Sequence, residues 1–502
     1  MDHSMDLASA GALYTLRHGN QEQQEAFREL QNLFCVERQT LLNVIHHFDA
    51  ELKAGLADDR NSDLDMIPSY VTGYPTGNEK GTYLALEIAG MDIYACQVNL
   101  KGDSGKLAIN QYQYKITPDL TSGDDFTVMI DYVVECIADF LTRVGTHPHQ
   151  DNKRQSYSHD AMASPPHSDP SFTYPMAVSF GFAIKQIGLN SGRILSLGHG
   201  FSYPNGVGVD VVQMMHERVK LKGLPIKIVA IANDAVCTLL AHAYQHPSTR
   251  VGIVHSLGTN CAYYEQARNV TKLKDQSSKD KAMIINTEWG NFGSSRRTLP
   301  CTWFDRKLDR ESINPQFHVF EKMTTGIFLG EVVRNVLIYL VDRDLVFGGE
   351  TSETLNRPYS FDTSYMYVCE SDETENLEDT RIVLEDMMDL SKTSMADREM
   401  VKNVCELIGS RAAMLVGAAI AAVVQHMTNE GIGLEEDHCV ISITGNIYED
   451  YPSFHHRVCH TLKDLLPDHI ASKLSVGIVK HSRIVGAAIV AMMAEKIAVA
   501  SS

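Results

Sequence analysis

The feature that most constrains the fold is an apolar stretch that passes directly from strand-like to helix-like sequence. It covers residues 226–246 and reads IKIVAIANDAVCTLLAHAYQH. The part before Asn233 has the apolar content of a buried strand, and the part after it has the spacing of a helix. A strand over 175–184 and a helix over 209–223 are predicted before it. This alternation predicts an α/β protein with parallel strands.

Two strand-turn-strand patterns occur in the two halves of the chain. The first lies within residues 83–114 and contains LEIAGMDIYA, and the second is VGIVHSLGTNCAYYEQ at 251–266. Both have an apolar strand, a turn with glycine and a second apolar strand. Their similarity indicates a duplicated fold with a cleft between two lobes. Helices are predicted over 126–144 and, in two pieces, over 21–56.

Four segments are expected to connect or cover these elements. Residues 66–81 are rich in Pro, Gly and Asn and predict a linker between lobes. Residues 145–171 are polar and aperiodic, which predicts a flexible surface insertion, and their histidines are better explained by a solvated loop than by a metal site. The acidic run at 370–379 predicts a solvated loop. The apolar run at 484–494 is too short to span a bilayer and predicts a buried helix.

The composition excludes several classes of protein. The formal net charge of −19 disfavours nucleic acid and acidic lipid as main partners. The first twenty residues lack the pattern of a signal peptide, and no membrane span is predicted. Ten cysteines are scattered without a CxxC pair, which is typical of a reducing compartment. An intracellular, cytoplasmic protein is expected, with the nucleus or the mitochondrial surface as alternatives.

The residues alone point to one candidate position for chemistry. Asp234 follows a buried strand and opens a helix, at the carboxyl end of a sheet where α/β proteins bind ligands. The alternative is a helix N-cap without chemistry. Asn260, Asn286, Glu288 and Glu321 are polar residues in apolar surroundings. Together they suit a neutral polyhydroxyl ligand, although each alone is more typical of a structural hydrogen-bonding group.

Seven segments follow one another in the order of a known family. They read GLNSGRI, VAIANDAVCTLLAH, GTNCAYY, MIINTEWGNFG, FEKMTTGIFLGEVVRNVLIYL, YPSF and VGAAIVA. Over about residues 48–493 the chain resembles the hexokinase family, fungal glucokinases in particular. The resemblance implies an α/β fold with two actin-like, ribonuclease H-like ATPase lobes around a central cleft. The domains that it implies are an N-terminal helical segment at 1–66, a small lobe at 67–230 with the insertion, a large lobe at 231–480, and a C-terminal helix at 481–502 that returns to the small lobe.

The resemblance also implies a sugar site. Asp234 stands at the position of the catalytic base, which accepts the proton of the sugar 6-hydroxyl as it attacks the γ-phosphate of MgATP. Asn233, Asn260, Glu288 and Glu321 stand where the family binds sugar hydroxyls.

The other half of the sugar site departs from the family. The Phe-Ser-Tyr-Pro segment aligns with residues 180–183, which read Phe-Gly-Phe-Ala, and the Thr-Lys pair aligns with Gly198 and His199. Two hydroxyls and an ammonium are thereby missing, with His199 left as the remaining polar candidate for sugar binding.

The first phosphate motif of the family, Asp-Leu-Gly-Gly-Thr-Asn-Phe-Arg, corresponds to Glu-Ile-Ala-Gly-Met-Asp-Ile-Tyr at 87–94. The positions that correspond to cofactor contacts are Glu87, Ala89, Gly90, Met91 and Tyr94. A Cβ at Ala89 obstructs close approach of phosphate, Met91 lacks a hydroxyl donor, and Tyr94 lacks a guanidinium. Asp92 adds a negative charge beside a polyanion.

The remaining nucleotide motifs also depart. Gly-Thr-Gly corresponds to Ser256, Leu257 and Gly258, followed by Thr259. Asp-Gly-Ser of the adenosine pocket corresponds to Thr444, Gly445 and Asn446, and the later Asp-Gly-Ser-Gly corresponds to residues 481–484, which read His-Ser-Arg-Ile. The family cofactor is MgATP, and these substitutions predict weakened binding; no resident metal site is predicted.

The sequence thus leads to a first hypothesis and two alternatives. The first is a hexokinase-like protein without appreciable kinase activity, which regulates or senses carbon and nutrient status through a partly retained hexose site. It resembles non-catalytic hexokinase relatives of fungi. The alternatives are an active ATP-dependent kinase of glucose or an amino sugar that feeds glycolysis, and a structural partner of an active hexokinase. Protein partners and a homo- or hetero-oligomer are expected for a regulator.

Overall fold

The computed structural model describes most of the chain. The described residues are 15–103, 105–145, 173–197, 201–273, 281–295, 298–432, 438–480 and 482–501. His199 and all but the first residue of the insertion predicted at 145–171 lie outside them.

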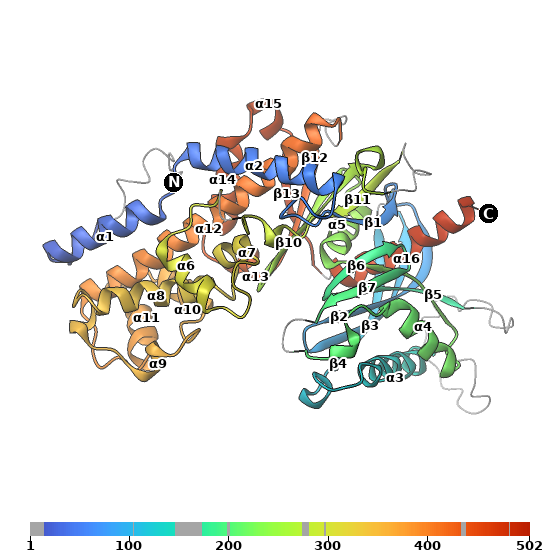
Figure 1. Ribbon diagram of the computed structural model, residues 1–502, viewed down its shortest axis with the longest axis horizontal. Coiled ribbons are helices and arrows are strands. Elements are labelled where there is room, and N and C mark those ends of the chain that lie inside the picture. Colours follow the sequence, from blue (N-terminus) through green and yellow to red (C-terminus); the bar gives the residue numbers. More distant parts are fainter. Residues whose placement is uncertain are drawn as a thin grey trace.

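A five-stranded sheet forms one end of the molecule (Figure 1). Its strands, in the order β4-β3-β2-β5-β8, are β4 (Lys106–Lys115), β3 (Asp92–Gly102), β2 (Lys80–Ala89), β5 (Tyr174–Phe180) and β8 (Ile226–Ala232). The first three pair antiparallel, and β2, β5 and β8 pair parallel. The predicted antiparallel strands over 83–114 and the parallel α/β arrangement are therefore confirmed.

Both faces of this sheet are covered, as the alternation along β2 requires. Leu84, Leu86 and Ile88 belong to a core shared with α3 (Thr127–Arg143) and α4 (Val211–Leu221). Ala85, on the opposite face, belongs to a core shared with the C-terminal helix α16 (Ser482–Ser501). Because side chains alternate along a strand, the residues of odd number in this part of β2, including Glu87, face α16.

A six-stranded sheet follows, in the order β1-β11-β10-β9-β12-β13. Its strands are β1 (Ile67–Thr72), β11 (Ala282–Asn286), β10 (Thr259–Gln266), β9 (Thr249–His255), β12 (Cys439–Thr444) and β13 (Leu474–Ile478). The second predicted hairpin is β9–β10. The prediction of a plain linker at 66–81 is wrong in part, because β1 pairs antiparallel with β11 at the edge of this sheet.

Two helices cross between the sheets. α5 (Asp234–Gln245) packs on β9, and α16 packs on α5 and on β2, β5 and β8. Their approach is close because Gly486 of α16 has no side chain: a Cβ there would overlap the carbonyl oxygen of Cys237. The predicted buried helix at 484–494 is confirmed as part of α16.

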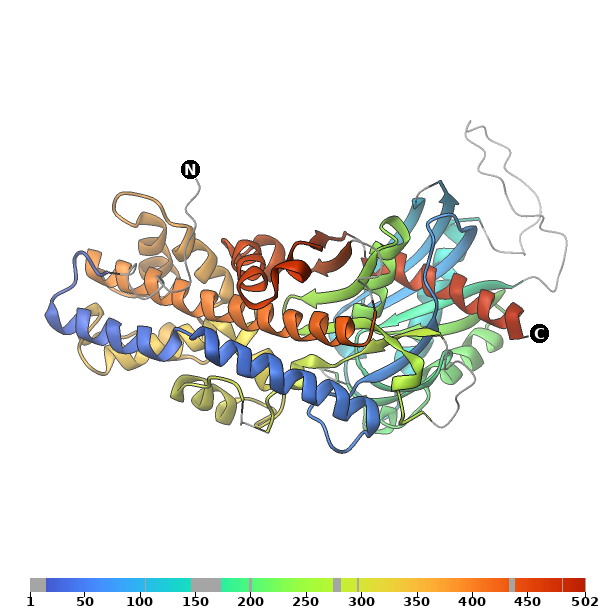
Figure 2. The same ribbon diagram turned by 90° about the horizontal axis from the view of Figure 1, so that it is seen from above.

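The other end of the molecule is helical. α12 (Met395–Asn429) lies alongside α1 (Gln21–Phe34) and α2 (Arg38–Ala57) (Figure 2). The remaining helices here are α6 (Trp303–Glu311), α7 (Val319–Thr324), α8 (Leu329–Val341), α9 (Glu353–Asn356), α10 (Thr363–Ser371), α11 (Glu378–Ile382), α13 (Asn446–Asp450), α14 (Phe454–Leu465) and α15 (Asp468–Ala471). Within the described residues, α12 alone is long and apolar enough to cross a membrane, and 94% of its most apolar window is buried inside the protein.

The strand predicted over 175–184 is two strands. β5 ends at Phe180, and β6 (Ala183–Gly188) pairs instead with β7 (Ser191–Ser196) in a separate two-stranded sheet. Phe182 lies between them and packs against Phe180 and Phe201. The apolar run therefore reflects an aromatic cluster at a bend rather than one continuous strand.

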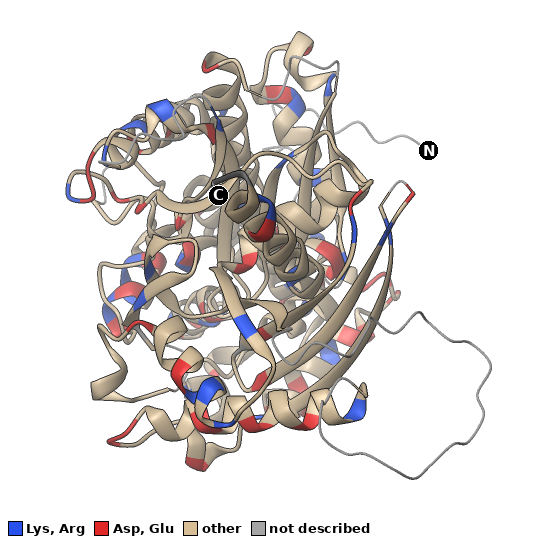
Figure 3. Ribbon diagram, turned by 90° about the vertical axis from the view of Figure 1, so that its right-hand side faces the viewer, with Lys and Arg blue, Asp and Glu red and all other residues tan. Residues whose placement is uncertain are grey.

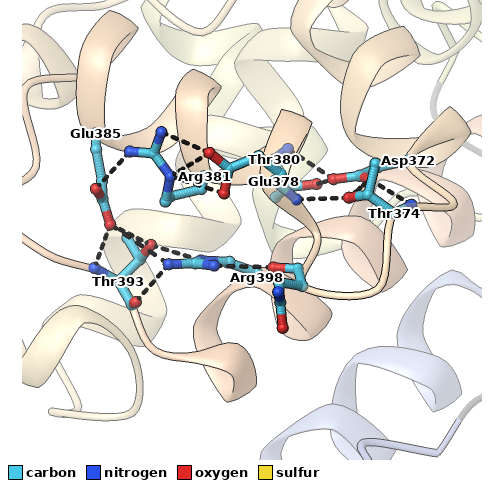
Figure 4. A network of polar contacts seen from close by, with 9 residues as sticks. Asp372, Thr374, Glu378, Thr380, Arg381, Glu385, Thr393 and Arg398 are labelled. Atoms are coloured by element: carbon cyan, nitrogen blue, oxygen red, sulfur yellow. Dashed lines mark hydrogen bonds and ion pairs between the residues drawn. The ribbon is translucent and has the colours of Figure 1, made fainter.

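The acidic run at 370–379 is only in part a solvated loop, because residues 373–376 are exposed and non-helical whereas its first carboxylates are buried. Glu370 is buried in α10 and accepts a hydrogen bond from the Tyr451 hydroxyl at 2.7 Å. Asp372 is also buried and accepts hydrogen bonds from Thr374 and Thr380, and Glu378 pairs with Arg381 (Figure 4). The charge pattern misled the prediction in part, because Glu370 has a partner distant in the sequence and Asp372 is satisfied by two threonine hydroxyls.

Acidic and basic residues are interspersed over the elements seen from the side of the five-stranded sheet (Figure 3). All ten cysteines lie in the described part of the chain, and no disulfide joins any two of them there.

Candidate functional site: an amide and carboxylate cluster beside two turns

The loop between β8 and α5 carries the first two candidate residues. Asn233 is the N-cap of α5, because its Oδ1 accepts a hydrogen bond from the backbone N–H of Ala235 at 2.8 Å. Asp234 occupies the first helical position and is half-buried. The alternative that Asp234 is itself the N-cap is therefore wrong. Capping by Asn233 leaves the Asp234 carboxylate available at the N-terminal end of the helix.

A chain of side-chain amides connects Asn233 to Glu288. Asn260 Nδ2 donates to Asn233 Oδ1 at 3.1 Å and to Asn286 Oδ1 at 2.8 Å. Asn286 Nδ2 in turn donates to Glu288 Oε1 at 2.8 Å. The ends of β8, β10 and β11 are thereby linked through side chains. Such a connected network holds each amide in one orientation, so that its remaining donors and acceptors face a fixed direction.

Glu321, in the helix α7, approaches the amide chain from the helical end of the molecule. Its Oε2 accepts a hydrogen bond from the backbone N–H of Thr259 at 3.1 Å, and its Oε1 lies 3.6 Å from His318 Nδ1. A Cβ at position 258 would come within 2.9 Å of Glu321 Oε2, so that a larger residue than Gly258 would displace this carboxylate. Thr259 Oγ1 accepts a hydrogen bond from the buried Trp289 indole at 2.9 Å.

Both glutamates have raised pKa values. Burial raises the pKa of Glu288 to about 7, with further contributions from the charges of Asp65, Asp234 and Glu321 and an opposing hydrogen bond from Asn286. Burial likewise raises the pKa of Glu321 to about 7. The charges of Asp65, Asp234 and Glu321 act on Glu288 because they lie near it. Hydrogen bonds link Asn233, Asn260, Asn286 and Glu288, and Glu321 is bonded to Thr259, the neighbour of Asn260, so that the structure brings these side chains into one cluster.

Glu288 also has an unusual backbone. Its φ is +52°, in the left-handed region that a non-glycine residue adopts rarely. Strain of this kind persists where the surroundings over-determine it and is common at functional sites.

The first candidate phosphate turn is a tight hairpin. Ala89 of β2 pairs with Asp92 of β3, so that Gly90 and Met91 alone form the loop. Gly90 has φ of +56°, and the Met91 side chain is 36% exposed. Asp92 accepts a hydrogen bond from Gln113 at 2.6 Å and pairs with Lys115. Polar groups of this turn are thus engaged by the neighbouring strand β4.

Glu87 and Tyr94 lie directly opposite each other on β2 and β3. Glu87 is buried, and its Oε1 accepts a hydrogen bond from Arg483 Nη1 at 3.0 Å. Burial raises the pKa of Glu87, and the Arg483 charge partly offsets that effect. The sequence showed Arg483 only as a departure from a motif and assigned it no role. Its partner is 396 positions away, and no local pattern could have revealed it.

The second turn and the adenosine motif are joined to each other. Ser256 Oγ donates to Asn446 Oδ1 at 2.6 Å, and Leu257 between the turn's polar residues is 58% exposed. Gly445 has φ of +128°, and a Cβ there would overlap the backbone of His255. Its N–H donates to Glu449 Oε1 at 2.9 Å. Gly445 is therefore needed for the close packing of these two segments.

The fold defines the class of protein. The structure matches solved hexokinase structures, with a TM-score of 0.80 and 28% identity to the hexokinase of Schistosoma mansoni complexed with glucose, over 93% of this chain and 99% of that one. A second hexokinase crystal structure, at 22% identity, matches with a TM-score of 0.78 over 95% of this chain. The predicted fold class, a two-lobed α/β hexokinase fold, is confirmed.

The sequence comparisons place the chain within that class. Two family models described as hexokinase match residues 26–244 and 250–493. Hexokinase-2 of Oryza sativa is 32% identical over 92% of this chain and 90% of its own length. Hexokinase-1 of Saccharomyces cerevisiae is 32% identical over 95% and 93%, and glucokinase of Aspergillus niger is 31% identical over 89% and 92%. The chain belongs to the hexokinase family, whose members use MgATP.

Proposed function

We propose that this hexokinase-family protein binds a hexose without appreciable phosphoryl transfer and acts as a sensor or regulator of carbon and nutrient status. The observation that carries the proposal is a contrast within one site. Hydrogen bonds connect the side chains from Asn233 through Asn260 and Asn286 to Glu288, whereas polar groups of the phosphate turns are engaged by other parts of the chain.

The sugar side supports retained binding. Asn260 and Asn286 are held by hydrogen bonds, and Glu288 and Glu321 offer carboxylate oxygens from the same cluster. Carboxylates and amides supply the acceptors and donors that sugar hydroxyls need. A site built around such groups discriminates strongly for a ligand that satisfies them, because unpaired polar groups are costly to bury. We therefore assign Asn233, Asn260, Glu288 and Glu321 to hexose binding.

The nucleotide side supports weak MgATP binding. Glu87 already pairs with Arg483, Ser256 with Asn446, and Asp92 places a carboxylate where phosphate would approach. Loss of one preorganised donor costs roughly 3 kcal/mol in transition-state stabilisation, and phosphoryl transfer depends almost entirely on such groups. Three independent losses would slow transfer about a million-fold. The chain's residues do not fit MgATP in the family's manner.

A thermal-shift titration tests the proposal. A ligand that binds only the folded state stabilises it by RT ln(1 + [L]/Kd), which is about 2.7 kcal/mol when the ligand is at a hundred times its Kd. Glucose at millimolar concentration is expected to raise the Tm, and MgATP alone is expected to leave it unchanged. The proposal is contradicted if MgATP stabilises the protein and glucose does not.

An active hexose kinase remains the second candidate, and one observation favours it. Capping of α5 by Asn233 leaves the Asp234 carboxylate beside Glu288, where it could accept the proton of a sugar hydroxyl. This candidate predicts that glucose and MgATP stabilise the protein together more than either does alone. Absence of that synergy supports the sensor.

A further inference from the structure

Arg483 places a guanidinium beside two carboxylates near the first candidate phosphate turn, those of Glu87 and Asp234. It lies in the first turn of α16, and its Nη1 donates to Glu87 Oε1 at 3.0 Å. The Glu87 side chain is 8% exposed and that of Arg483 is 36% exposed, so the pair is largely shielded from solvent. Burial lowers the pKa of Arg483, but the charges of Glu87 and Asp234 raise it above its ordinary value. The guanidinium therefore interacts electrostatically with both carboxylates.

The position of Arg483 is fixed by the surrounding helices. α16 crosses α5 closely at Gly486, and Ser482 Oγ accepts a hydrogen bond from Thr238 Oγ1 at 3.2 Å. Arg483 thus follows directly after a residue that is tied to α5, the helix that begins with Asp234. Glu87 is held in register by the pairing of β2 with β3 and β5. Both partners of the ion pair therefore lie on elements of regular secondary structure, Glu87 on β2 and Arg483 on α16.

The resemblance places a serine of the family at position 483 and an arginine at position 94. This chain has the arginine at 483 and Tyr94 at the strand position opposite Glu87. The cationic group near the buried carboxylate therefore comes from α16 in place of β3.

We propose that Arg483 is a resident counter-ion that balances the negative charges of Glu87 and Asp234 without a divalent cation. It thereby lowers the affinity of these two carboxylates for a metal ion. The inference rests on the proposed function and explains one cause of weak MgATP binding. A guanidinium bonded to a carboxylate oxygen removes an acceptor that a hard cation would use, and its charge repels a second cation at short range.

Binding of Mn²⁺ alone, measured on the full chain by electron paramagnetic resonance, tests the inference. Arg483→Ser is expected to bind Mn²⁺ about tenfold more tightly than the wild type, a change of one decade in Kd. Arg483→Lys keeps the cation and is expected to match the wild type. The double variant Glu87→Gln with Arg483→Ser removes the carboxylate and is expected to lose the gain.

Lys496→Ser is the matched control. Lys496 also lies on α16 and pairs with a buried glutamate, Glu79, at 3.0 Å, on a part of the helix remote from Arg483 in sequence. The Lys496→Ser variant is expected to have the same Kd for Mn²⁺ as the wild type. If Arg483→Ser does not fold, Arg483→Gln retains most of the side-chain stem and carries the same expectation of tighter Mn²⁺ binding.

Equal Mn²⁺ affinity of the wild type and the neutral variants at position 483 would overturn the inference, as would an equal gain in Lys496→Ser. Either result leaves the proposed function standing, because that proposal is tested by glucose and MgATP. Conversely, phosphoryl transfer by the wild type would overturn the proposed function and leave the Mn²⁺ comparison as an independent test of Arg483.

Discussion

The proposed hexose site depends above all on Asn260. Its Nδ2 donates to both Asn233 and Asn286, so that it connects three strand ends. Its Oδ1 accepts from the N–H of Cys261 at 2.7 Å. One side chain thus fixes the amide on either side of it.

Asn260→Ala is expected to reduce the free energy of unfolding by about 1–3 kcal/mol, because buried partners lose their hydrogen bonds. The same change is expected to abolish the thermal shift with glucose. Chemical denaturation and the glucose titration measure the two effects. Asn110→Ala, at an exposed amide of β4, is the control, with an expected change within about 0.5 kcal/mol. A glucose shift that survives in Asn260→Ala would contradict the assignment of this residue.

Sequence alone identified several of these residues but not their arrangement. Asp234 could be chosen because a strand runs directly into a helix there, and Asn260, Asn286, Glu288 and Glu321 because they are polar residues in apolar surroundings. The family resemblance added Asn233. The capping role of Asn233 and the pairing of Arg483 with Glu87 could not be predicted, because both depend on geometry that local patterns do not specify. His199 lies outside the described residues, and its role stays a prediction.

At the scale of elements, the proposed loss of phosphoryl transfer involves two turns, of which the β2–β3 hairpin is the first. Ala89, Met91 and Tyr94 differ from the family in the first turn, and Ser256 and Leu257 differ in the second. The two turns lie on different sheets. Repair of one turn therefore does not restore the phosphate-binding donors of the other turn.

Replacement of the first turn alone, by Ala89→Gly, Met91→Thr and Tyr94→Arg, is therefore expected to leave phosphoryl transfer undetected. Addition of Ser256→Gly and Leu257→Thr is expected to raise the rate by about a hundredfold or more, the effect of one restored donor group. A coupled assay with glucose and MgATP measures both variants. Strong activity after repair of the first turn alone would contradict this account.

His426 ties three elements together. Its Nδ1 lies 2.9 Å from Asp49 of α2, and its Nε2 lies 2.7 Å from Glu265 of β10, while His426 itself belongs to α12. Burial alone would lower the pKa of His426, but the two carboxylates raise it to about 9. The charged imidazolium is therefore the stable form in the folded protein at neutral pH.

Because the folded-state pKa exceeds the unfolded value of about 6.5, this contribution is fully present below pH 6.5 and is lost as pH rises through 9. The free energy of unfolding is expected to fall by about 3 kcal/mol over that window in the wild type relative to His426→Gln. Urea denaturation across pH measures the difference. His456→Gln, at an exposed position of α14, should retain the wild-type pH dependence. A parallel profile for His426→Gln and the wild type would show that the imidazolium makes no such contribution.

Most elements could be predicted from periodicity, and the exceptions have physical causes. The helices at 21–56, 126–144 and 209–223 bury one apolar face, which periodicity detects. β1 was missed within 66–81 because Pro and Gly suggest a loop, although an edge strand tolerates them. The acidic run was misread in part, because Glu370 pairs with the distant Arg457 and Asp372 is buried against the Thr380 hydroxyl.

At the scale of the whole molecule, two sheets joined by α5 and α16 bring the polar site together from distant parts of the sequence. The alternation of strands and helices predicted this class of fold, and the two similar hairpins predicted its division into two lobes. The exact domain boundaries, at 66–67, 230–231 and 480–481, stay predictions. So do the compartment and the protein partners, because neither a surface charge pattern nor a fold specifies them.

We propose that this member of the hexokinase family retains a sugar site and lacks appreciable phosphoryl transfer. The most direct test is the turnover of the purified wild-type chain with MgATP and a panel of hexoses that includes glucose and glucosamine. The account predicts turnover more than about a hundredfold below a typical enzyme rate of about 10 per second. Turnover within about a hundredfold of that rate, with any hexose of the panel, would contradict it.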